Sequence, residues 1–351
     1  MKKRLLLCAL PFAATAMPAH AIVGLASSGA ISSGGDSRYL AQGEAYSGVV
    51  GLLIDWGNDS YSTCTGTLLS DRRSILTAGH CTSEKGGKST PVSTTVYFDN
   101  GSDPDANIFE DTIEGNVQIA VSNTTTHPEY TTSTIDQNDI AVLTLAELAP
   151  DWATSYDLYE SSDLQGQTHT SVGYGLRGVA DEEGEFEEVG SRRQGTNRYD
   201  YRTGEEVFGD QYDSGRAYKE NLYMSDFDDG SEKADINCES ASFWGNDETG
   251  KYCDRGSATE GLNMAGDSGG PQLIDGKIAS ITSAGLEGAN GEGTPGSTSY
   301  LVPIYTHVDF IRSAMIGAIP EPATWLQMLL GFAMLGGMLR TTPSRTVVRR
   351  I

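Results

Sequence analysis

Short apolar runs divided by turn residues fill the first half of this 351-residue chain. The turn residues include Gly57-Asn58-Asp59 and Ser70-Asp71, and each run between such turns has the length of a strand. Short strands at this spacing favour a β-barrel or a β-sandwich. The predicted strands are Val49 to Trp56, Thr65 to Leu69, Ser74 to Ala78, Val92 to Phe98 and Val117 to Val121.

A second group of strands lies toward the carboxyl end. Gln272 to Ile274 and Lys277 to Thr282 predict a hairpin, because Asp275-Gly276 between them is a strong two-residue turn signal. Tyr300 to Ile304 is the last predicted strand, and Tyr305 to Ile316 then changes to helical periodicity. The pattern therefore predicts an all-β protein that ends in one helix.

The amino end has the features of a secretory signal peptide. Met1-Lys2-Lys3-Arg4 is basic, Leu5 to Ala16 is apolar, and Ala19-His20-Ala21 has the small-x-small pattern of a cleavage site. Residues 1–21 are therefore predicted to be removed on export from the cytoplasm. The Gly-, Ser- and Ala-rich stretch from Ile22 to Gly43 is predicted to be a poorly structured lead.

The carboxyl end contains another apolar segment. Pro320-Glu321-Pro322 precedes an uncharged run from Ala323 to Leu339, and four arginines follow. A helix of this length spans about 25 Å, which is sufficient where a bilayer thins, and the arginines predict a cytoplasmic end. A buried core helix with a basic tail is the alternative, although Gly331, Gly336 and Gly337 suit a membrane helix better.

The Pro-Glu-Pro, helix and arginine sequence resembles the PEP-CTERM sorting signal of Gram-negative bacteria. The resemblance implies export across the inner membrane of such a bacterium and processing by an exosortase-type enzyme. It also implies that the chain is anchored in the membrane through its C-terminal helix at least transiently, and is then anchored, at the cell surface or secreted.

Acidic residues outnumber basic ones, with 48 Asp and Glu against 24 Lys and Arg. Without the two end segments 17 basic and 47 acidic residues remain, a net charge of about −30. Such a charge repels nucleic acid, so no nucleic-acid partner is expected. It attracts cations instead.

Three local patterns carry candidate chemistry. Gly266-Asp267-Ser268-Gly269-Gly270-Pro271 places a serine in a glycine-lined turn that a substrate carbonyl can approach, but its hydroxyl needs a neighbouring base. Leu76-Thr77-Ala78-Gly79-His80-Cys81 and Asn138-Asp139-Ile140-Ala141-Val142-Leu143 supply a histidine and an aspartate beside apolar runs. Each pattern alone fits an ordinary turn or strand end, whereas the three together predict a catalytic site.

The order and the signatures resemble the chymotrypsin/trypsin family of serine endopeptidases over roughly residues 46 to 316. The resemblance implies two six-stranded antiparallel β-barrels and a C-terminal helix, with the active site in the cleft between the barrels. It makes His80 the general base, Asp139 the group that holds its tautomer, and Ser268 the nucleophile. The backbone N–H groups of Gly266 and Ser268 would form the oxyanion hole.

The same resemblance places the base of the primary substrate pocket at Leu262, where trypsin-like enzymes carry an aspartate. An apolar floor cannot compensate the desolvation of Arg or Lys, so an apolar residue is expected before the cut bond. Ser283, Ala284 and Gly285 form the strand that would pair with the substrate backbone. Ala284 and Met264 replace a tryptophan and a disulfide-forming cysteine found in many relatives, which makes this pocket a departure from the family pattern.

Two further family features occur in the sequence. Cleavage after Ala21 would leave Ile22-Val23-Gly24 at the amino end, which is similar to the activating end of the family. By that resemblance the freed ammonium of Ile22 pairs with Asp267 and orders the oxyanion hole. His127 in His127-Pro128-Glu129-Tyr130 also resembles the family, where this histidine is structural.

Four cysteines remain after Cys8 leaves with the signal peptide. An even number in an exported chain predicts two disulfides, for which three connectivities exist. The family resemblance selects Cys64 with Cys81, which staples the histidine loop, and Cys238 with Cys253. A zinc site is the alternative, although neither pair has a short Cys-x-x-Cys spacing.

The chain therefore divides into a signal peptide (1–21), a trypsin-like protease domain (22–318) and an anchor or sorting segment (319–351). Within the domain the first barrel is expected at about 46–150 and the second at about 165–316, with an insertion at about 178–235 that is larger than relatives usually carry. The tyrosines of this insertion either form a substrate-binding patch or pack between loops and strands. They are Tyr199, Tyr201, Tyr212, Tyr218 and Tyr223.

No cofactor and no metal site are predicted from the sequence. Asp99, Asp103 and Asp105 could take Ca²⁺, but they also fit an ordinary solvated loop. The stretch Asp226-Phe227-Asp228-Asp229-Gly230 is one residue short of an EF-hand spacing, so it is not assigned to calcium either.

The leading functional hypothesis is an exported serine endopeptidase that acts on proteins or peptides through an acyl-enzyme. An esterase or amidase with the same triad is one alternative. A catalytically idle binding protein is another, although idle relatives usually lose a triad member and none is lost here.

Overall fold

The computed structural model describes residues 22–25, 37–83, 90–103, 106–133, 135–180, 186–187, 189–204, 221–243, 251–288, 291 and 293–317. The predicted signal peptide and the predicted anchor lie outside these residues. Within the described ranges, no helix has both the length and the apolar character needed to cross a membrane.

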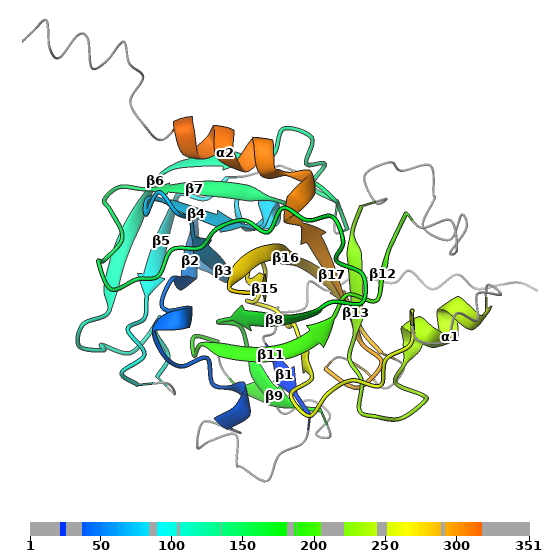
Figure 1. The fold of residues 1–351 in the computed structure, drawn as a ribbon. Coiled ribbons are helices and arrows are strands. Elements are labelled where there is room, and N and C mark those ends of the chain that lie inside the picture. Colours follow the sequence, from blue (N-terminus) through cyan, green and yellow to red (C-terminus); the bar gives the residue numbers. More distant parts are fainter. Residues whose placement is uncertain are drawn as a thin grey trace, which may run out of the picture.

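Six antiparallel strands of the first half close into a barrel, in the order β2-β3-β4-β7-β6-β5 (Figure 1). Their apolar side chains fill the barrel, with Leu52, Ile54 and Leu143 no more than 1% exposed. The five strands predicted in this half are confirmed. The strands are β2 (Val49–Gly57), β3 (Ser60–Leu68), β4 (Ser74–Thr77), β5 (Ser93–Phe98), β6 (Val117–Thr126) and β7 (Ala141–Leu145).

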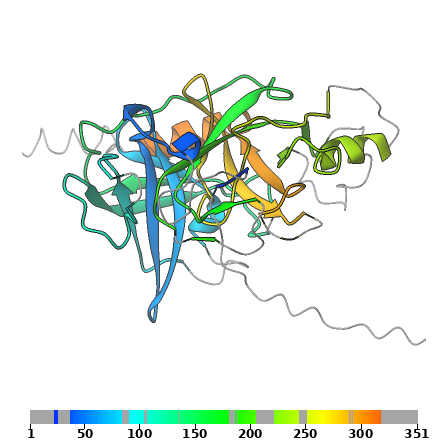
Figure 2. The same ribbon diagram turned by 90° about the horizontal axis from the view of Figure 1, so that it is seen from below.

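Two-residue turns fix the register of two hairpins, of which only the one at Asp275-Gly276 is predicted from the sequence. Asn58 and Asp59 have φ of 54° and 60° between β2 and β3, and Asp275 and Gly276 have φ of 51° and 70° in the second half. Two successive positive φ angles match the right-handed twist of the flanking strands. The β2–β3 hairpin is long and extends beyond the neighbouring strands (Figure 2).

The second half forms an open seven-stranded antiparallel sheet, in the order β11-β8-β15-β16-β17-β13-β12. The expected second closed six-stranded barrel is therefore not formed by the described residues. Because the edge strands β11 and β12 are consecutive in the chain, the sheet still curls back toward itself. Its strands are β8 (Thr168–Gly173), β11 (Arg193–Arg198), β12 (Tyr201–Arg202), β13 (Tyr223–Asp226), β15 (Pro271–Ile274), β16 (Lys277–Leu286) and β17 (Thr298–Pro303).

The expected insertion at 178–235 contributes three of these strands, so much of it belongs to the fold rather than being added to it. β11 pairs with β8, and β13 pairs with β17. The inward-facing residues of β11 are Arg193, Gly195 and Asn197, and this polar set gives no apolar alternation for sequence reasoning to detect.

The described tyrosines of this segment favour packing over a substrate-binding patch. Tyr199, Tyr201 and Tyr223 are each less than 5% exposed and belong to the core of the sheet. Tyr212 and Tyr218 lie outside the described residues.

A smaller four-stranded sheet has the order β10-β9-β1-β14. Its strands are β1 (Val23–Gly24), β9 (Arg177–Val179), β10 (Phe186–Glu187) and β14 (Gly261–Leu262). Val23 pairs with Leu262 and is fully buried, and Ile22 is 2% exposed. The expectation of a poorly structured lead is therefore wrong at its start, because these apolar residues are inserted between strands from the second half.

Two α-helices occur in the described residues, α1 (Ile236–Phe243) and α2 (Val308–Gly317). The predicted carboxyl-terminal helix is confirmed as α2, which lies across β6 and β7 of the barrel (Figure 1). α1, which was not predicted, lies beyond β13 at the far end of the sheet (Figure 1). Short 3₁₀ turns are formed by Ser37–Tyr39, Glu44–Tyr46, Gly79–Cys81 and Ile304–Thr306.

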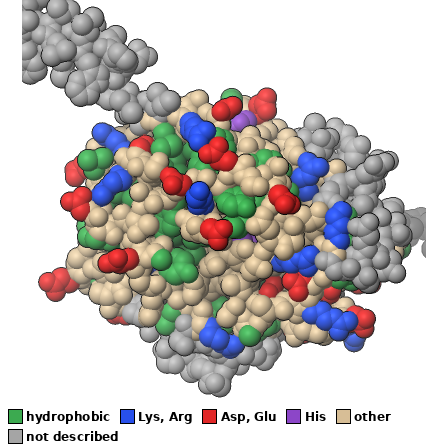
Figure 3. Space-filling model, in the orientation of Figure 1, with side chains coloured by type: hydrophobic (Ala, Val, Ile, Leu, Met, Phe, Trp, Pro, Cys, Tyr) green, Lys and Arg blue, Asp and Glu red, His purple; other side chains and the backbone are tan. Residues whose placement is uncertain are grey.

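Part of the acidic excess lies in the interior. On the face shown in Figure 3, acidic and basic side chains both occur, and several of them lie next to each other. Asp139, Asp267, Asp226 and Asp228 are instead at most 2% exposed. A buried carboxylate is costly unless it is hydrogen-bonded or paired with a cation, so each of these groups requires an account of its partners.

Candidate active site

The carboxylate of Asp139 accepts three hydrogen bonds. Its Oδ1 accepts the backbone N–H of His80 at 2.7 Å, and its Oδ2 lies 2.7 Å from Nδ1 of His80. The hydroxyl of Ser283 donates to the same Oδ2 at 2.6 Å. Because an ionised carboxylate only accepts hydrogen bonds, Nδ1 of His80 carries the proton and Nε2 remains a free base.

Local structure brings His80 and Asp139 together. His80 lies in the 3₁₀ turn after β4, where a Cβ on Gly79 would come 3.1 Å from Oδ1 of Asp139. Asp139 lies just before β7, at the end of a loop ordered by Asp136. The carboxylate of Asp136 accepts the backbone N–H of Thr131 at 2.7 Å and that of Asn138 at 2.8 Å.

Two opposing effects set the pKa of His80, whose side chain is one-third exposed. Burial lowers this pKa by disfavouring the charged imidazolium, but the negative charge of Asp139 and the hydrogen bond to it raise the pKa. The pair interaction outweighs burial, so the pKa of His80 is raised above its ordinary value of 6.5.

The turn that carries Ser268 packs against the strand end that leads to His80. The backbone oxygen of Ser268 accepts the N–H of Thr65 at 2.9 Å and lies 3.7 Å from Sγ of Cys81. Gly269 has φ of 79°, and a Cβ there would come 2.2 Å from Oγ1 of Thr77. Only glycine fits this close approach, and the structure thereby brings the Ser268 turn beside the His80 loop.

Two backbone N–H groups of this turn are free. Those of Gly266 and Ser268 donate no hydrogen bond to any described residue, whereas those of Asp267, Gly269 and Gly270 all do. Gly266 has φ of 95°, a conformation that favours glycine. The hydroxyl of Ser268 likewise makes no hydrogen bond within the described residues, and catalytic hydrogen bonds often tighten only when substrate binds.

Ser283 lies at a bulge in β16, where the register with β17 shifts between Thr282 and Ala284. A bulge inserts one residue and can re-aim its side chain. Sequence reasoning assigned Ser283 to the substrate strand, whereas the structure directs its hydroxyl to Asp139. A hydrogen bond of this kind leaves no signal in the sequence, because it depends on the bulge.

The remaining part of the predicted substrate strand is accessible. Ala284 is half-buried and Gly285 is exposed. β15 pairs with β16 only as far as Ile281, so beyond Thr282 this edge of β16 has no strand partner among the described residues.

Leu262, the predicted floor of the substrate pocket, lies in β14 and is 2% exposed. It packs in an apolar cluster with Val23, Phe227 and Met264.

Asp267 is fully buried next to the nucleophile turn. Its carboxylate accepts the backbone N–H groups of Gly175 at 3.2 Å and Met264 at 3.0 Å. Burial raises the pKa of Asp267 to about 7 despite these donors. No ion pair joins it to Ile22 or to any other described residue in the full-length chain, where the nitrogen of Ile22 is still part of a peptide bond.

The structure joins Cys64 to Cys81 and Cys238 to Cys253 as disulfides. These four cysteines therefore have no free thiolate to offer to the alternative zinc site. His127 packs its ring on those of His307 and Phe310, at 5.1 Å and 4.7 Å between centroids, which fits a packing role.

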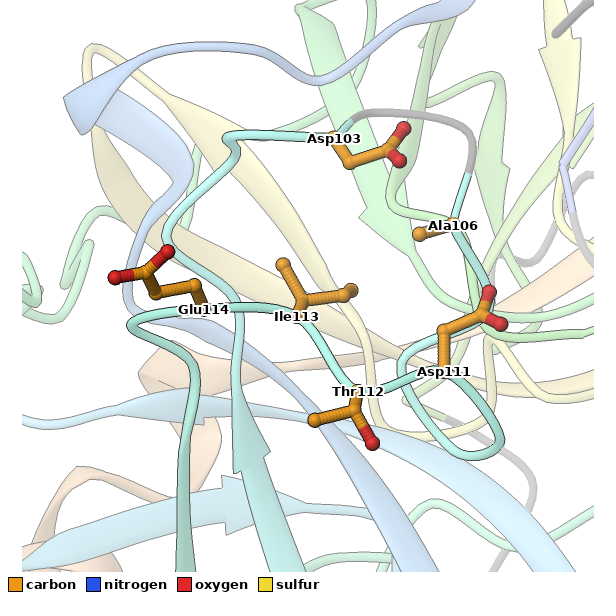
Figure 4. Close-up of a pocket in the computed structure, with 6 residues that line it drawn as sticks. All are labelled: Asp103, Ala106, Asp111, Thr112, Ile113 and Glu114. Carbon is orange, nitrogen blue, oxygen red and sulfur yellow. The ribbon is translucent and has the colours of Figure 1, made fainter.

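The acidic loop at residues 99–105, predicted to be an ordinary solvated loop, is partly buried at its start. Asp99 is 3% exposed and its carboxylate lies 3.6 Å from Nη1 of the buried Arg192, while Asp105 lies outside the described residues. Asp103 lines a nearby hollow, where Glu114 points away from Asp103 and Asp111 (Figure 4). The hollow is lined by Asp103, Ala106, Asp111, Thr112, Ile113 and Glu114.

The closed barrel, the curled second sheet and the His80–Asp139 pair at their junction define a protein of the serine protease class. The sequence model of the Trypsin family matches residues 42–218, just over half of the 351 residues, so the chain belongs to the trypsin family. The matched range includes His80 and Asp139 and ends before Ser268. No curated protein matches the chain.

The electrostatics of the pair predict the effect of Asp139→Asn on His80. The substitution removes the negative charge that raises the pKa of His80 and leaves the burial that lowers it. The pKa of His80 should therefore fall below its value in the unmodified chain, as measured by proton NMR of the imidazole. His307, whose pKa burial lowers to about 4, serves as the internal control. An unchanged or higher pKa of His80 would show that Asp139 does not control it.

Proposed function

We propose that the chain is a serine endopeptidase whose triad is His80, Asp139 and Ser268. The observation that carries the proposal is the buried Asp139 carboxylate, which holds Nδ1 of His80 at 2.7 Å and leaves Nε2 free as a base. The Ser268 turn packs against the loop of that histidine. A base, its orienting carboxylate and a serine on a glycine turn are the components of acyl transfer.

The proposed reaction proceeds through an acyl-enzyme. Nε2 of neutral His80 takes the proton of the Ser268 hydroxyl as its Oγ attacks the scissile carbonyl, and Asp139 stabilises the imidazolium that forms. The free N–H groups of Gly266 and Ser268 donate to the developing oxyanion. His80 then gives the proton to the leaving amine, and water hydrolyses the Ser268 ester by the same steps in reverse roles.

The open edge of β16 supports a peptide substrate. An extended peptide can add to an unpaired strand edge through backbone hydrogen bonds, and Ala284 and Gly285 present such an edge. This arrangement favours an endopeptidase over an esterase, because a small ester has no backbone to pair with β16.

We expect each of Ser268→Ala, His80→Ala and Asp139→Asn to lower kcat/KM for casein-derived peptides by on the order of 10⁴ or more. Circular dichroism and melting temperature serve to show that each variant remains folded. His127→Ala is the matched control, since His127 lies against α2, and its kcat/KM should change far less.

A second readout separates the endopeptidase from its alternatives. A fluorophosphonate should label Ser268 in the unmodified chain, and a catalytically idle protein would not react. Cleavage of a nitrophenyl ester without cleavage of casein would favour the esterase. Near-normal peptidase activity in any of the three triad variants would remove that residue from the triad.

The apolar surroundings of Leu262 support preference for an apolar residue before the cut bond. Arg or Lys would lose its hydration against Leu262 without gaining a counter-charge. A peptide library sequenced after digestion should show cleavage after apolar residues, with Arg and Lys at least tenfold less frequent. Preferential cleavage after Arg or Lys would contradict the assigned floor.

Export and carboxyl-terminal sorting complete the proposal. Residues 1–21 would direct the chain across the inner membrane of a Gram-negative bacterium, and residues 319–351 would anchor it until an exosortase-type enzyme acts. Both segments lie outside the described residues, so the proposals of export and sorting are supported by the sequence alone. The intact mass of the protein recovered from its host reports both ends.

The burial of Ile22 and Asp267 supports activation by signal cleavage. Removing residues 1–21 creates an ammonium on Ile22, and its pairing with Asp267 would supply the cation that this buried carboxylate lacks. The pair raises the pKa of the amine above its free value of about 8, so the ordered state should be lost as pH rises through that raised pKa.

We therefore expect a chain that starts at Ile22 to be at least tenfold more active than one with an added alanine before Ile22. Ile22→Val at the native length keeps both the amine and a buried aliphatic side chain, so it should retain most of the activity. Equal activity with and without the added alanine would show that the Ile22 amine does not order the oxyanion hole.

A further inference from the structure

Four carboxylates are buried together on the side of the sheet that leads to β14. Asp226 ends β13, Asp228 follows it, Asp235 precedes α1, and Glu260 precedes β14. They are between 2% and 5% exposed. The oxygens of Asp226, Asp228 and Asp235 all lie within 4.8 Å of one another.

Asp228 has an unsatisfied oxygen inside this group. Its Oδ1 is buried and has no hydrogen-bond partner. The carboxylates of Asp226, Asp235 and Glu260 accept the backbone N–H groups of Asn237, Cys238 and Ser257, and Asp226 also shares a hydrogen bond with the buried carboxyl of Asp200. Among the described residues, no Lys or Arg forms an ion pair with any of the four. Arg198 pairs with Asp254 and Arg255 with the exposed Glu232, although the charge of Arg255 partly offsets the raised pKa of Asp235.

We propose that Asp226, Asp228 and Asp235 bind one Ca²⁺, with Glu260 at the rim of the site. Carboxylate oxygens are the ligands that calcium prefers, and a buried oxygen without a donor is the kind of group that a cation satisfies. Asp235 also lies close to Cys238 and Cys253, but these cysteines are joined in a disulfide and cannot ligate a metal as thiolates.

The donor set fits calcium better than magnesium. Calcium takes about 6–8 oxygen ligands in irregular coordination, which suits carboxylates from separate segments of the chain. Magnesium demands a near-ideal octahedron and usually keeps several waters.

The electrostatics support the geometry. Burial, and then the negative charges of Asp226, Asp235 and Glu260, raise the pKa of Asp228 to about 9. Burial likewise raises the pKa of Glu260 to about 8. These groups therefore repel one another in the absence of a counter-ion, and a divalent cation reverses that effect.

The site would connect the end of β13, the start of α1 and the residue before β14, the strand that carries Leu262. Asp226 fixes the end of β13, Asp235 accepts the N–H of Cys238 in the first turn of α1, and Glu260 is bonded directly to β14. Gly256, with φ of 73°, lies between two of these groups. A Cβ there would come 2.7 Å from Cβ of Asp228 and 3.2 Å from the carboxyl carbon of Glu260.

Isothermal titration of the full chain carrying Ser268→Ala, which prevents self-digestion, tests the site. After treatment with EGTA, the chain should bind Ca²⁺. The substitution Asp228→Asn should weaken the affinity for Ca²⁺ at least tenfold. Asp229→Asn is the matched control: it removes the same charge from the next residue, which is exposed, and should leave the affinity unchanged. Glu114→Gln should also have no effect, which separates this site from the hollow in Figure 4.

Melting curves supply a readout that a purely structural role would not produce. Calcium at about one hundred times its Kd should raise the melting temperature by on the order of 5 °C in the parent chain. Asp228→Asn should abolish this gain, yet melt at the same or a higher temperature than the parent in EGTA, because it relieves the repulsion.

Three results would overturn the proposal. One is the absence of both binding heat and a calcium-dependent shift in melting temperature. Another is loss of binding in Glu114→Gln with retention in Asp228→Asn, which would place the ion in the other acidic region. The third is magnesium binding as tightly as calcium, which would contradict the assigned ion.

Discussion

The burial of the Asp139 carboxylate is the constraint on which the candidate site depends. A carboxylate at 1% exposure requires strong donors, and here they come from both halves of the chain, two from His80 in the barrel and one from Ser283 in the second sheet. The Ser283 contact that helps to satisfy the charge therefore also joins the second sheet to the barrel. The need to bury one charge thus orients the base and aligns the two halves.

The parts of the structure that local chemistry decides are predictable from the sequence. The Asp275-Gly276 turn and the short strands of the barrel follow from residue type, and so does the glycine turn around Ser268. Prediction fails where tertiary contacts decide: β11 has a polar inward face, so its membership of the sheet depends on partners distant in the chain. Ser283 was placed correctly in β16, but the bulge that directs its hydroxyl to Asp139 has no signature in the residues.

The acidic composition takes on a second meaning once burial is known. From the sequence, a charge of −24 suggests solubility and repulsion of polyanions. The structure places several of these carboxylates where water cannot solvate them, at Asp267 and in the group around Asp228. Each is costly as it stands, because burial and like charges raise its pKa toward or above neutrality. The proposed Ile22 ammonium and the proposed Ca²⁺ would each lower this cost.

The two buried acidic regions meet at β14. Val23 of β1 pairs with Leu262 of β14, next to the amine that cleavage would create on Ile22, and Glu260 of the acidic group is bonded to the same strand. The hydroxyl of Tyr39 donates to the backbone oxygen of Glu260 and accepts the N–H of Leu25, which joins the two regions directly. The proposed ammonium and the proposed divalent cation would therefore both stabilise β14, the strand that carries the predicted pocket floor. Both favour the ordered state of β14, so binding of one reduces the conformational entropy that is lost when the other binds. Their effects on activity are therefore expected to be cooperative.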